Sequence, residues 1–266
     1  MDDIVLAHTA TKLASAAGRV VICGSHGGTY AGLLAASAGV RGIILNDAGK
    51  GRADAGVRGL DVCAAHGLAA VTVRHDSCRI GDADDTAARG TVSAVNPVAA
   101  TLGIAVGDTA AAAAERLGGA PQPRSRPAAG DEHRSVRQMG DWTLVIVDSN
   151  ALVRPHEDDG AIIITGSHGG LVGGDPASAG RANAALFAFN DAGIGCDEAG
   201  VSRLPALQAR GIAAVCVDCF SAEIGSGQST LDNGLVSRAN PAAEALGAHA
   251  GLAVAALVEA IAARRR

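Results

Sequence analysis

Residues 18–28, GRVVICGSHGG, and residues 160–170, GAIIITGSHGG, match at 7 of 11 positions when one is laid on the other. In both stretches a run of β-branched and other apolar residues is bounded by glycine, a pattern that predicts a buried β-strand ending in a glycine-rich turn. The same strand and turn therefore occur twice in one chain, which indicates an internal duplication.

Two further stretches repeat in the same order. Residues 46–57, NDAGKGRADAGV, match residues 190–201, NDAGIGCDEAGV, at 8 of 12 positions, and residues 77–103 match residues 221–247 at 12 of 27. The offset is 142 for GSHGG and 144 for the two later stretches, so one two-residue insertion explains the whole alignment.

Each copy alternates between strand and helix patterns. In the first copy we expect strands at 19–23, 41–46 and 69–74, and helices at about 29–38, 57–66 and 83–95. In the second we expect strands at 161–165, 184–190 and 212–218. An extra strand is expected to open each copy, at 3–7 and at 142–147, the latter in a hairpin with 135–139.

The fold class that follows is α/β, with two tandem Rossmann-like βαβαβ repeats, mostly parallel sheets and an approximate two-fold relation between them. We expect the first repeat at 1–117 and the second at 134–266. The proline-containing stretch 118–133 is expected to be a linker. A single continuous sheet running through both copies is the alternative.

Composition excludes several functions. Aromatic residues make up 2% of the chain, too few for stacking against single-stranded nucleic acid. The net charge is −5 and no basic stripe stands out, so neither nucleic acid nor an anionic membrane is an expected partner. The acidic start has no signal-peptide pattern and no apolar run approaches 18 residues, so we expect a cytoplasmic protein. The Ala-rich helices could form an interface, so a homo-oligomer or a complex with a partner enzyme subunit is also possible.

The repeated motifs fall at strand carboxyl ends, where open parallel sheets bind ligands. Ser25 and Ser167 are candidate nucleophiles or orienters of water, although a serine cap on a glycine turn would also explain them. His26 and His168 are candidate general bases or structural hydrogen-bonding residues. Glycine N–H groups after each histidine would form an oxyanion hole or bind an anion, at Gly27, Gly28, Gly169 and Gly170.

The second motif offers Asp47 and Asp191 as orienters of a histidine, or as turn residues. Asn46 and Asn190 are candidate donors to substrate. The third motif keeps Ser77 and Ser221, both candidate substrate contacts. Its other polar positions differ between the copies, which suggests one asymmetric site or two unequal ones.

Arg79 is a candidate for holding a substrate carboxylate, or a surface partner of Asp82. Cys219 lies just past a strand end and is the alternative nucleophile to the serines, although a nearby Asp218 would raise the pKa of its thiol. Cys216 and Cys219 form a C-x-x-C with no second pair, and no metal ligand set is evident, so we expect no metal. A nicotinamide or flavin signature is also missing, and no cofactor is expected.

These residues predict a hydrolase acting on a small polar amide, imide or ester that bears a carboxylate. One alternative is a non-catalytic anion-binding subunit of a larger complex, and another is a cofactor-independent lyase or isomerase. The tandem repeats resemble in organisation the cyclic-amide hydrolases that open cyanuric acid and barbiturate rings. That family has three repeats around Ser-Lys dyads; this chain has two repeats and no such dyad, so no residue role is carried across.

Overall fold

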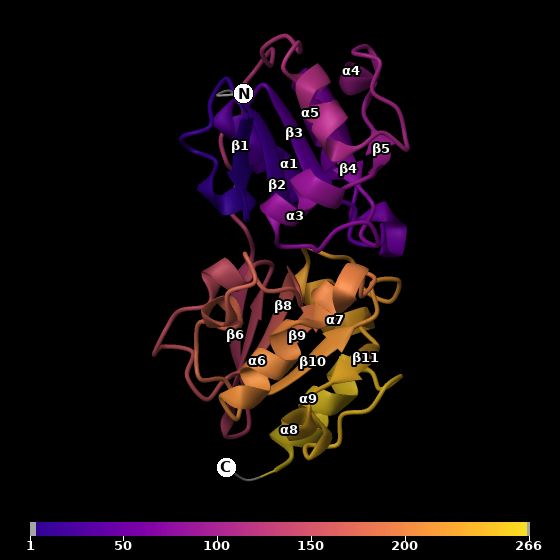
Figure 1. Cartoon of the computed structure of the whole chain (residues 1–266). Coiled ribbons are helices and arrows are strands. Elements are labelled where there is room, and N and C mark those ends of the chain that lie inside the picture. The colour runs from indigo at the N-terminus through magenta and orange to yellow at the C-terminus, as the bar shows by residue number, and fades with distance from the viewer. Residues whose placement is uncertain (1–3, 265–266) are drawn as a thin grey trace.

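The structure is a computed structural model that describes residues 4–264, and it contains two separate β-sheets, one above the other in Figure 1. The first has the order β1–β2–β3–β4–β5. Its strands are β1 (Ile4–Ala7), β2 (Val20–His26), β3 (Gly42–Asn46), β4 (Ala69–Val73) and β5 (Val92–Val95). Strands β1 to β4 are parallel and β5 is antiparallel to β4. The alternative of one continuous sheet is therefore wrong.

The second sheet repeats this arrangement and adds a strand at one edge. Its order is β11–β10–β9–β8–β7–β6. The strands are β6 (Arg134–Met139), β7 (Trp142–Val147), β8 (Ile162–His168), β9 (Leu186–Asn190), β10 (Ala213–Val217) and β11 (Val236–Ala239). Strands β7 to β10 are parallel, and β6 pairs antiparallel with β7, which confirms the expected hairpin. The chain thus has the expected α/β fold of two tandem Rossmann-like repeats.

Helices cover both faces of each sheet. In the first repeat α1 (Thr29–Ala38) and α2 (Gly59–Ala65) lie on one face, and α3 (Ala83–Arg89), α4 (Pro97–Ala100) and α5 (Ala110–Leu117) on the other. Successive side chains of a strand point to opposite faces, so Val21 packs toward α1 while Val20 and Ile22 pack toward α5.

In the second repeat α7 (Gly227–Asn233), α8 (Pro241–Glu244) and α9 (Val254–Ala262) lie on one face of the sheet. The other face carries α6 (Arg203–Ala209) and the segment 179–184. Among residues 4–264, no helix has the length and apolar character needed to cross a membrane.

Two elements differ from the expectation. The helix expected at 83–95 stops at Arg89, because Gly90 turns the chain and the β-branched residues that follow form the edge strand β5. A helix follows His26, as expected, but none follows His168. There the chain makes a loop in which Gly173 and Gly174 adopt positive φ values, and only a short 3₁₀ turn forms at Pro176–Ser178.

The two repeats meet through the second and third sequence motifs. A small apolar cluster joins them, and its members are three pairs of equivalent residues: Ala48 and Ala192, Ala55 and Ala199, Ile80 and Ile224. Two backbone hydrogen bonds cross the interface reciprocally, from Arg52 N–H to the Cys219 carbonyl at 2.8 Å and from Cys196 N–H to the His75 carbonyl at 2.9 Å. Each bond is the counterpart of the other in the internal alignment, so the repeats are related by an approximate two-fold axis.

Gly49 and Gly193 lie at the centre of this interface. A Cβ atom added to Gly49 would be 3.1 Å from the Gly193 Cα, and one added to Gly193 would be 3.1 Å from the Gly49 Cα. Around them the backbone is strained in both repeats, since the equivalent residues Ala48 and Ala192 have φ values of 49° and 51°. Such left-handed conformations are unfavourable for alanine and persist only where surrounding contacts enforce them.

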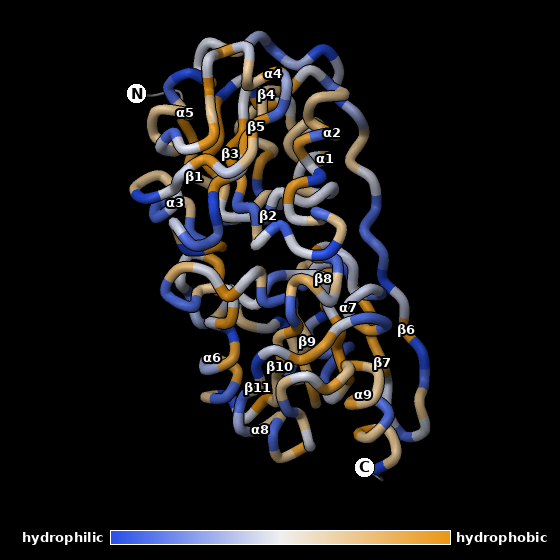
Figure 2. Tube along the Cα trace, turned by 90° about the vertical axis from the view of Figure 1, so that its right-hand side faces the viewer, coloured by the Kyte–Doolittle hydropathy of each residue, from blue (hydrophilic) through white to orange (hydrophobic). Residues whose placement is uncertain are grey.

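The linker runs along the first repeat before the second sheet begins, at one side of the molecule in Figure 2. The Arg124 N–H donates to the His66 carbonyl at 2.8 Å, and the Tyr30 hydroxyl donates to the Gly130 carbonyl at 3.0 Å. These contacts hold the last part of the linker, including Glu132, beside the junction of the two repeats.

Candidate functional site

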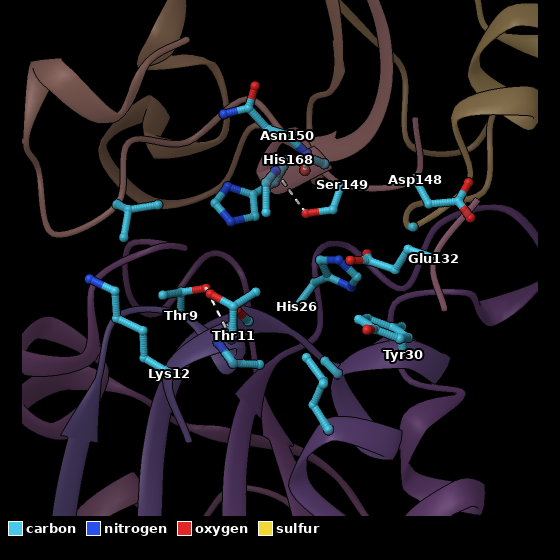
Figure 3. Close-up of a pocket in the computed structure, with 18 of the residues that line it drawn as sticks. Thr9, Thr11, Lys12, His26, Tyr30, Glu132, Asp148, Ser149, Asn150 and His168 are labelled. Carbon is cyan, nitrogen blue, oxygen red and sulfur yellow. Dashed lines mark hydrogen bonds between the residues drawn. The ribbon is translucent and has the colours of Figure 1, made fainter. Parts of the chain in front are cut away.

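A central cavity of about 290 Å³ lies between the repeats at the carboxyl ends of their strands. Both copies of the first motif line it through Ser25, His26, Ser167 and His168. The structure thus brings four of the predicted catalytic residues together. Figure 3 shows the two histidines on opposite sides of the gap, with Lys12 toward one end and Glu132 and Tyr30 toward the other.

The two serines fasten each strand end to the turn before it. Ser25 Oγ accepts a hydrogen bond from the Ala10 N–H at 2.9 Å, and Ser167 Oγ accepts one from the Asn150 N–H at 2.8 Å. Each hydroxyl can still donate its proton to a molecule in the cavity. Neither hydroxyl is hydrogen-bonded to a histidine within the described part of the chain, so the arrangement favours binding or orienting over nucleophilic attack.

The two histidines share one protonation state. His26 Nδ1 accepts from the Gly28 N–H at 3.1 Å, and His168 Nδ1 accepts from the Gly170 N–H at 3.2 Å. A neutral imidazole whose Nδ1 is an acceptor carries its proton on Nε2. Burial lowers the pKa of His26 to about 4 and that of His168 well below its usual range, with further lowering of the latter by Arg203 and His26. Both rings are therefore neutral Nε2–H donors near pH 7.

The candidate acid–base group is Glu132, which comes from the linker and was not predicted. Burial, and then the charge of Asp148, raises the pKa of this carboxyl to about 7. A carboxyl with that pKa is present in both protonation states at neutral pH and can take up and return a proton. Asp148 itself is held in place by hydrogen bonds from the His133 and Gly227 N–H groups.

The asparagines and aspartates of the second motif do not line the cavity. Asn46 and Asn190 are fully buried, and their Oδ1 atoms accept from the Ala48 and Ala192 N–H groups at 2.9 Å. Asp47 Oδ1 accepts from His75 Nδ1 at 3.0 Å, so this carboxylate orients a histidine other than His26.

Among residues 4–264, no histidine is hydrogen-bonded to Asp191 in this way. Its Oδ1 accepts from the Gly193 and Cys219 N–H groups, and burial raises its pKa. In the first repeat burial would also raise the pKa of Asp47, but the hydrogen bonds and charge of His75 outweigh it and the pKa is lowered. The second motif therefore shapes the interface and its loops.

The glycines of the first motif are needed for packing. A Cβ on Gly27 would lie 2.6 Å from Thr72 Cγ2, and one on Gly169 would lie 2.5 Å from Cys216 Sγ. Their N–H groups donate to the Asn46 and Asn190 carbonyls at 2.7 Å. Because the Gly28 and Gly170 N–H groups bind the histidines, none of the four forms the expected oxyanion hole.

The third motif also serves structure. Ser77 Oγ donates to the Arg74 carbonyl and accepts from the Thr91 N–H, and Ser221 makes the equivalent bonds with Asp218 and Leu235. These serines brace the turn after β4 or β10 and lie outside the central cavity.

The polar positions that differ between the copies form different interface ion pairs. Arg79 binds Asp197 at 2.9 Å rather than Asp82, and the equivalent Glu223 binds Arg58 at 2.7 Å. Arg79 lines a second pocket with Asp197 and does not reach the central cavity. The third motif thus differs between the copies because its charged residues form two different ion pairs between the repeats.

Cys219 is poorly suited to act as a nucleophile. Its side chain is buried, and burial followed by the charges of Asp191 and Asp218 raises the pKa of the thiol to about 12. Thiolate is then scarce at neutral pH. Its ligand atom does lie within 4.8 Å of those of Asp191 and Asp218, and His8, Asp82 and Asp84 form a second such group. Neither group lines the central cavity.

Within the described part of the chain, three cationic side chains line the cavity: Lys12 and Arg181, both exposed, and Arg203, which is 3% exposed. Arg203 has a signal in the sequence, because it replaces Gly59 where GVRGL of the first repeat aligns with GVSRL of the second. Glu132 has no such signal, since it belongs to the linker and has no counterpart in the other repeat.

No protein-family model matches this sequence, and no curated protein or solved structure is significantly similar to it.

Proposed function

We propose that the chain is a hydrolase acting on a small polar amide, imide or ester that bears a carboxylate, in the central cavity. One observation carries this proposal: two neutral imidazoles, one from each repeat, present Nε2–H donors to the cavity that also holds a carboxyl with a pKa of about 7. Donors aimed at an oxygen on which charge develops, together with a base, are what carbonyl hydrolysis requires.

Glu132 in its carboxylate form takes a proton from a water molecule, and the resulting hydroxide attacks the carbonyl carbon of the substrate. The carbonyl π electrons move to oxygen, and the Nε2–H groups of His26 and His168 stabilise the negative charge that forms there. When the tetrahedral intermediate collapses, the C–N or C–O bond breaks. The leaving nitrogen or oxygen then receives the proton that Glu132 had taken.

The serines act by positioning in this mechanism. Ser25 and Ser167 line the cavity and keep their hydroxyl protons available, while their oxygens are occupied by backbone N–H groups. Orienting the attacking water or a substrate oxygen needs only such a donor. No covalent acyl-serine is formed.

The decisive experiment measures hydrolysis of a panel of N-acyl amino acids, cyclic imides and esters by wild type and by Glu132→Gln. We expect Glu132→Gln to lower kcat/KM at least about 100-fold, the size of a general-base effect. The exposed Glu244→Gln, outside the cavity, is the matched control. Undiminished turnover by Glu132→Gln would exclude this mechanism, and binding without any turnover would favour an anion-binding subunit.

The same groups support a second reaction, proton transfer next to a carbonyl. A neutral imidazole that polarises a carbonyl beside a glutamate base is also the pairing used in enolising isomerases. Incubation with substrate in D₂O and in H₂¹⁸O separates the two reactions. Hydrolysis places ¹⁸O in the carboxylic product, whereas enolisation places deuterium on the carbon next to the carbonyl.

A further inference from the structure

Arg203 is a buried cation at the start of α6, in the wall of the central cavity. Its Nε donates to the His168 carbonyl at 3.2 Å, and Nη1 donates to the Ala179 carbonyl at 2.8 Å and to the Ser178 carbonyl. The guanidinium carbon lies 5.1 Å from the centre of the Phe189 ring. The side chain is thus held firmly by neutral groups.

No carboxylate within residues 4–264 forms a salt bridge with Arg203, and its Nη2 donates to no protein acceptor there. Arg134, whose side chain is 12% exposed, contrasts with it, because Arg134 Nη2 lies 2.8 Å from Asp158 Oδ1. Burying an ion without a counter-ion is costly.

The charge is also specific to one side of the cavity. Gly59 stands at the equivalent position of the first repeat and carries no side chain. Burial lowers the pKa of Arg203 to about 10, which still leaves the guanidinium protonated at neutral pH. A permanent, rigidly held and uncompensated cation therefore borders one half of the cavity.

We infer that Arg203 is the anion-binding residue of the central cavity and that the carboxylate of the substrate is its counter-ion. The identification of this carboxylate as part of the substrate rests on the proposed function. The binding of an anion by Arg203 needs no turnover. The carboxylate accepts hydrogen bonds from the Nη2–H groups of Arg203, and these bonds are charge-assisted. Because Nε of the same guanidinium holds the His168 carbonyl, the anionic end of the substrate lies on the side of the second repeat. The exposed Lys12 and Arg181 guide the anion toward it.

The test uses matched ligand pairs that differ only in charge: N-acetylglycine with N-acetylglycinamide, and 5-oxoproline with 5-oxoprolinamide. Affinities are measured by calorimetry on the full chain carrying Glu132→Gln, which removes hydrolysis. We expect the acids to bind at least about 10-fold more tightly than the amides, as one hydrogen bond to a charged group predicts. Arg203→Met should abolish that preference and Arg203→Lys should restore part of it.

Arg210→Met is the matched control. Arg210 also holds carbonyls of the loop before β9, those of Gly180 and Ala182, but it does not line the cavity. Its substitution should leave the preference for acids intact. If Arg203→Met does not fold, NMR of wild type with ¹⁵N-labelled arginine replaces it, and the Arg203 guanidinium signal should shift on addition of N-acetylglycine but not of the amide.

Equal binding of acids and amides, no binding of any acid at millimolar concentration, or an unchanged preference in Arg203→Met would each overturn the inference. Arg203-dependent binding of acids with no hydrolysis by wild type would leave the inference standing and remove the proposed function. Hydrolysis that proceeds equally well on the uncharged amides would overturn the inference, and it would leave the hydrolytic mechanism standing without its requirement for a substrate carboxylate.

Discussion

His26 of the first repeat and His168 of the second lie edge to face, with ring centroids 6.4 Å apart and ring planes at 81°. Each is held through Nδ1 by a backbone N–H two residues further along the chain. The pair is thus a symmetric set of two donors at the junction of two repeats. Burial lowers the pKa of both rings, and the charges of Arg203 and His26 lower that of His168 further.

The donor role of the histidines predicts how substitutions rank. His26→Gln keeps a side-chain N–H and should retain more activity than His26→Leu, which has no donor. Loss of one donor to a developing oxyanion costs about 10²–10³ in kcat. If the histidine were instead a general base, Gln and Leu would be equally inactive, and kcat measured for both variants decides between the roles.

The raised pKa of Glu132 predicts the pH dependence of activity. The mechanism needs the carboxylate, so kcat/KM should rise with pH and level off above about pH 7, where Glu132 is ionised. The pKa of His26 is about 4, so this ring is neutral over the whole range in which Glu132 ionises. The histidines therefore add no second inflection to the pH profile there. A profile whose midpoint lies near pH 4.5 would exclude Glu132 as the base.

The same histidines should make the protein less stable in acid. The pKa of His26 is about 4 when folded and about 6.5 when unfolded, so the unfolded chain binds more protons between these values. The free energy of unfolding should therefore fall by about 2–3 kcal/mol as the pH drops from 6.5 to 4. Denaturant titrations of wild type and His26→Asn test this, and the variant should lose part of the pH dependence.

The ion pair of Asp47 and His75 should lose its stabilising effect as the pH rises, whereas the effect of His26 appears as the pH falls. The hydrogen bond that His75 donates to Asp47 raises the pKa of His75, so the stabilisation is fully present below about pH 6.5 and is lost as the pH rises through the raised value. Asp47→Asn keeps the backbone contacts and removes the charge, and we expect it to cost about 1 kcal/mol at pH 6 and nothing at pH 9.

The equivalent substitution Asp191→Asn is its matched comparison. Burial raises the pKa of Asp191 and no histidine is bonded to it in the described structure, so removing this charge should be neutral or stabilising at pH 7. Equal destabilisation by both substitutions would show that the ion pair contributes nothing.

The contact of Gly49 with Gly193 predicts a large effect of a single methyl group. Gly49→Ala places a Cβ 3.1 Å from the Gly193 Cα at a φ of 74°, and we expect about 2–4 kcal/mol of destabilisation from strain and crowding together. Gly107→Ala is the control, because φ is 95° there and no atom lies within 4 Å of the added Cβ. It should cost only about 1 kcal/mol. Thermal unfolding that fails to separate the two variants would contradict the importance of this interface.

Strands, turns and the two-fold relation could be predicted from sequence because glycine turns and apolar runs are local features and occur twice. What each polar residue contacts could not be predicted in the same way. Asn46 and Ser77 recur as faithfully as His26, but they brace loops and turns, because docking the repeats on each other constrains side chains as strongly as binding a ligand does. Arg79 and Glu223 differ between copies because each found a different partner across the interface.

Glu132 eluded prediction for another reason. Its pKa depends on burial beside Asp148, a property of how the linker is laid against folded repeats rather than of any local pattern. Arg203 was detectable as an arginine in place of Gly59, but its lack of a counter-ion is visible only in three dimensions.

The path of the linker has a consequence for symmetry. Reciprocal contacts such as those of Arg52 with Cys219 and Cys196 with His75 are those of an isologous interface, the kind formed by two identical subunits of a homodimer. In a homodimer every side chain at the axis is present twice, and a carboxyl near the axis would face its own copy. The linker that joins the two repeats occurs only once and passes the axis once. Through it the fused chain delivers one Glu132 to a pair of equivalent histidines, so a two-fold frame encloses a single, directional site.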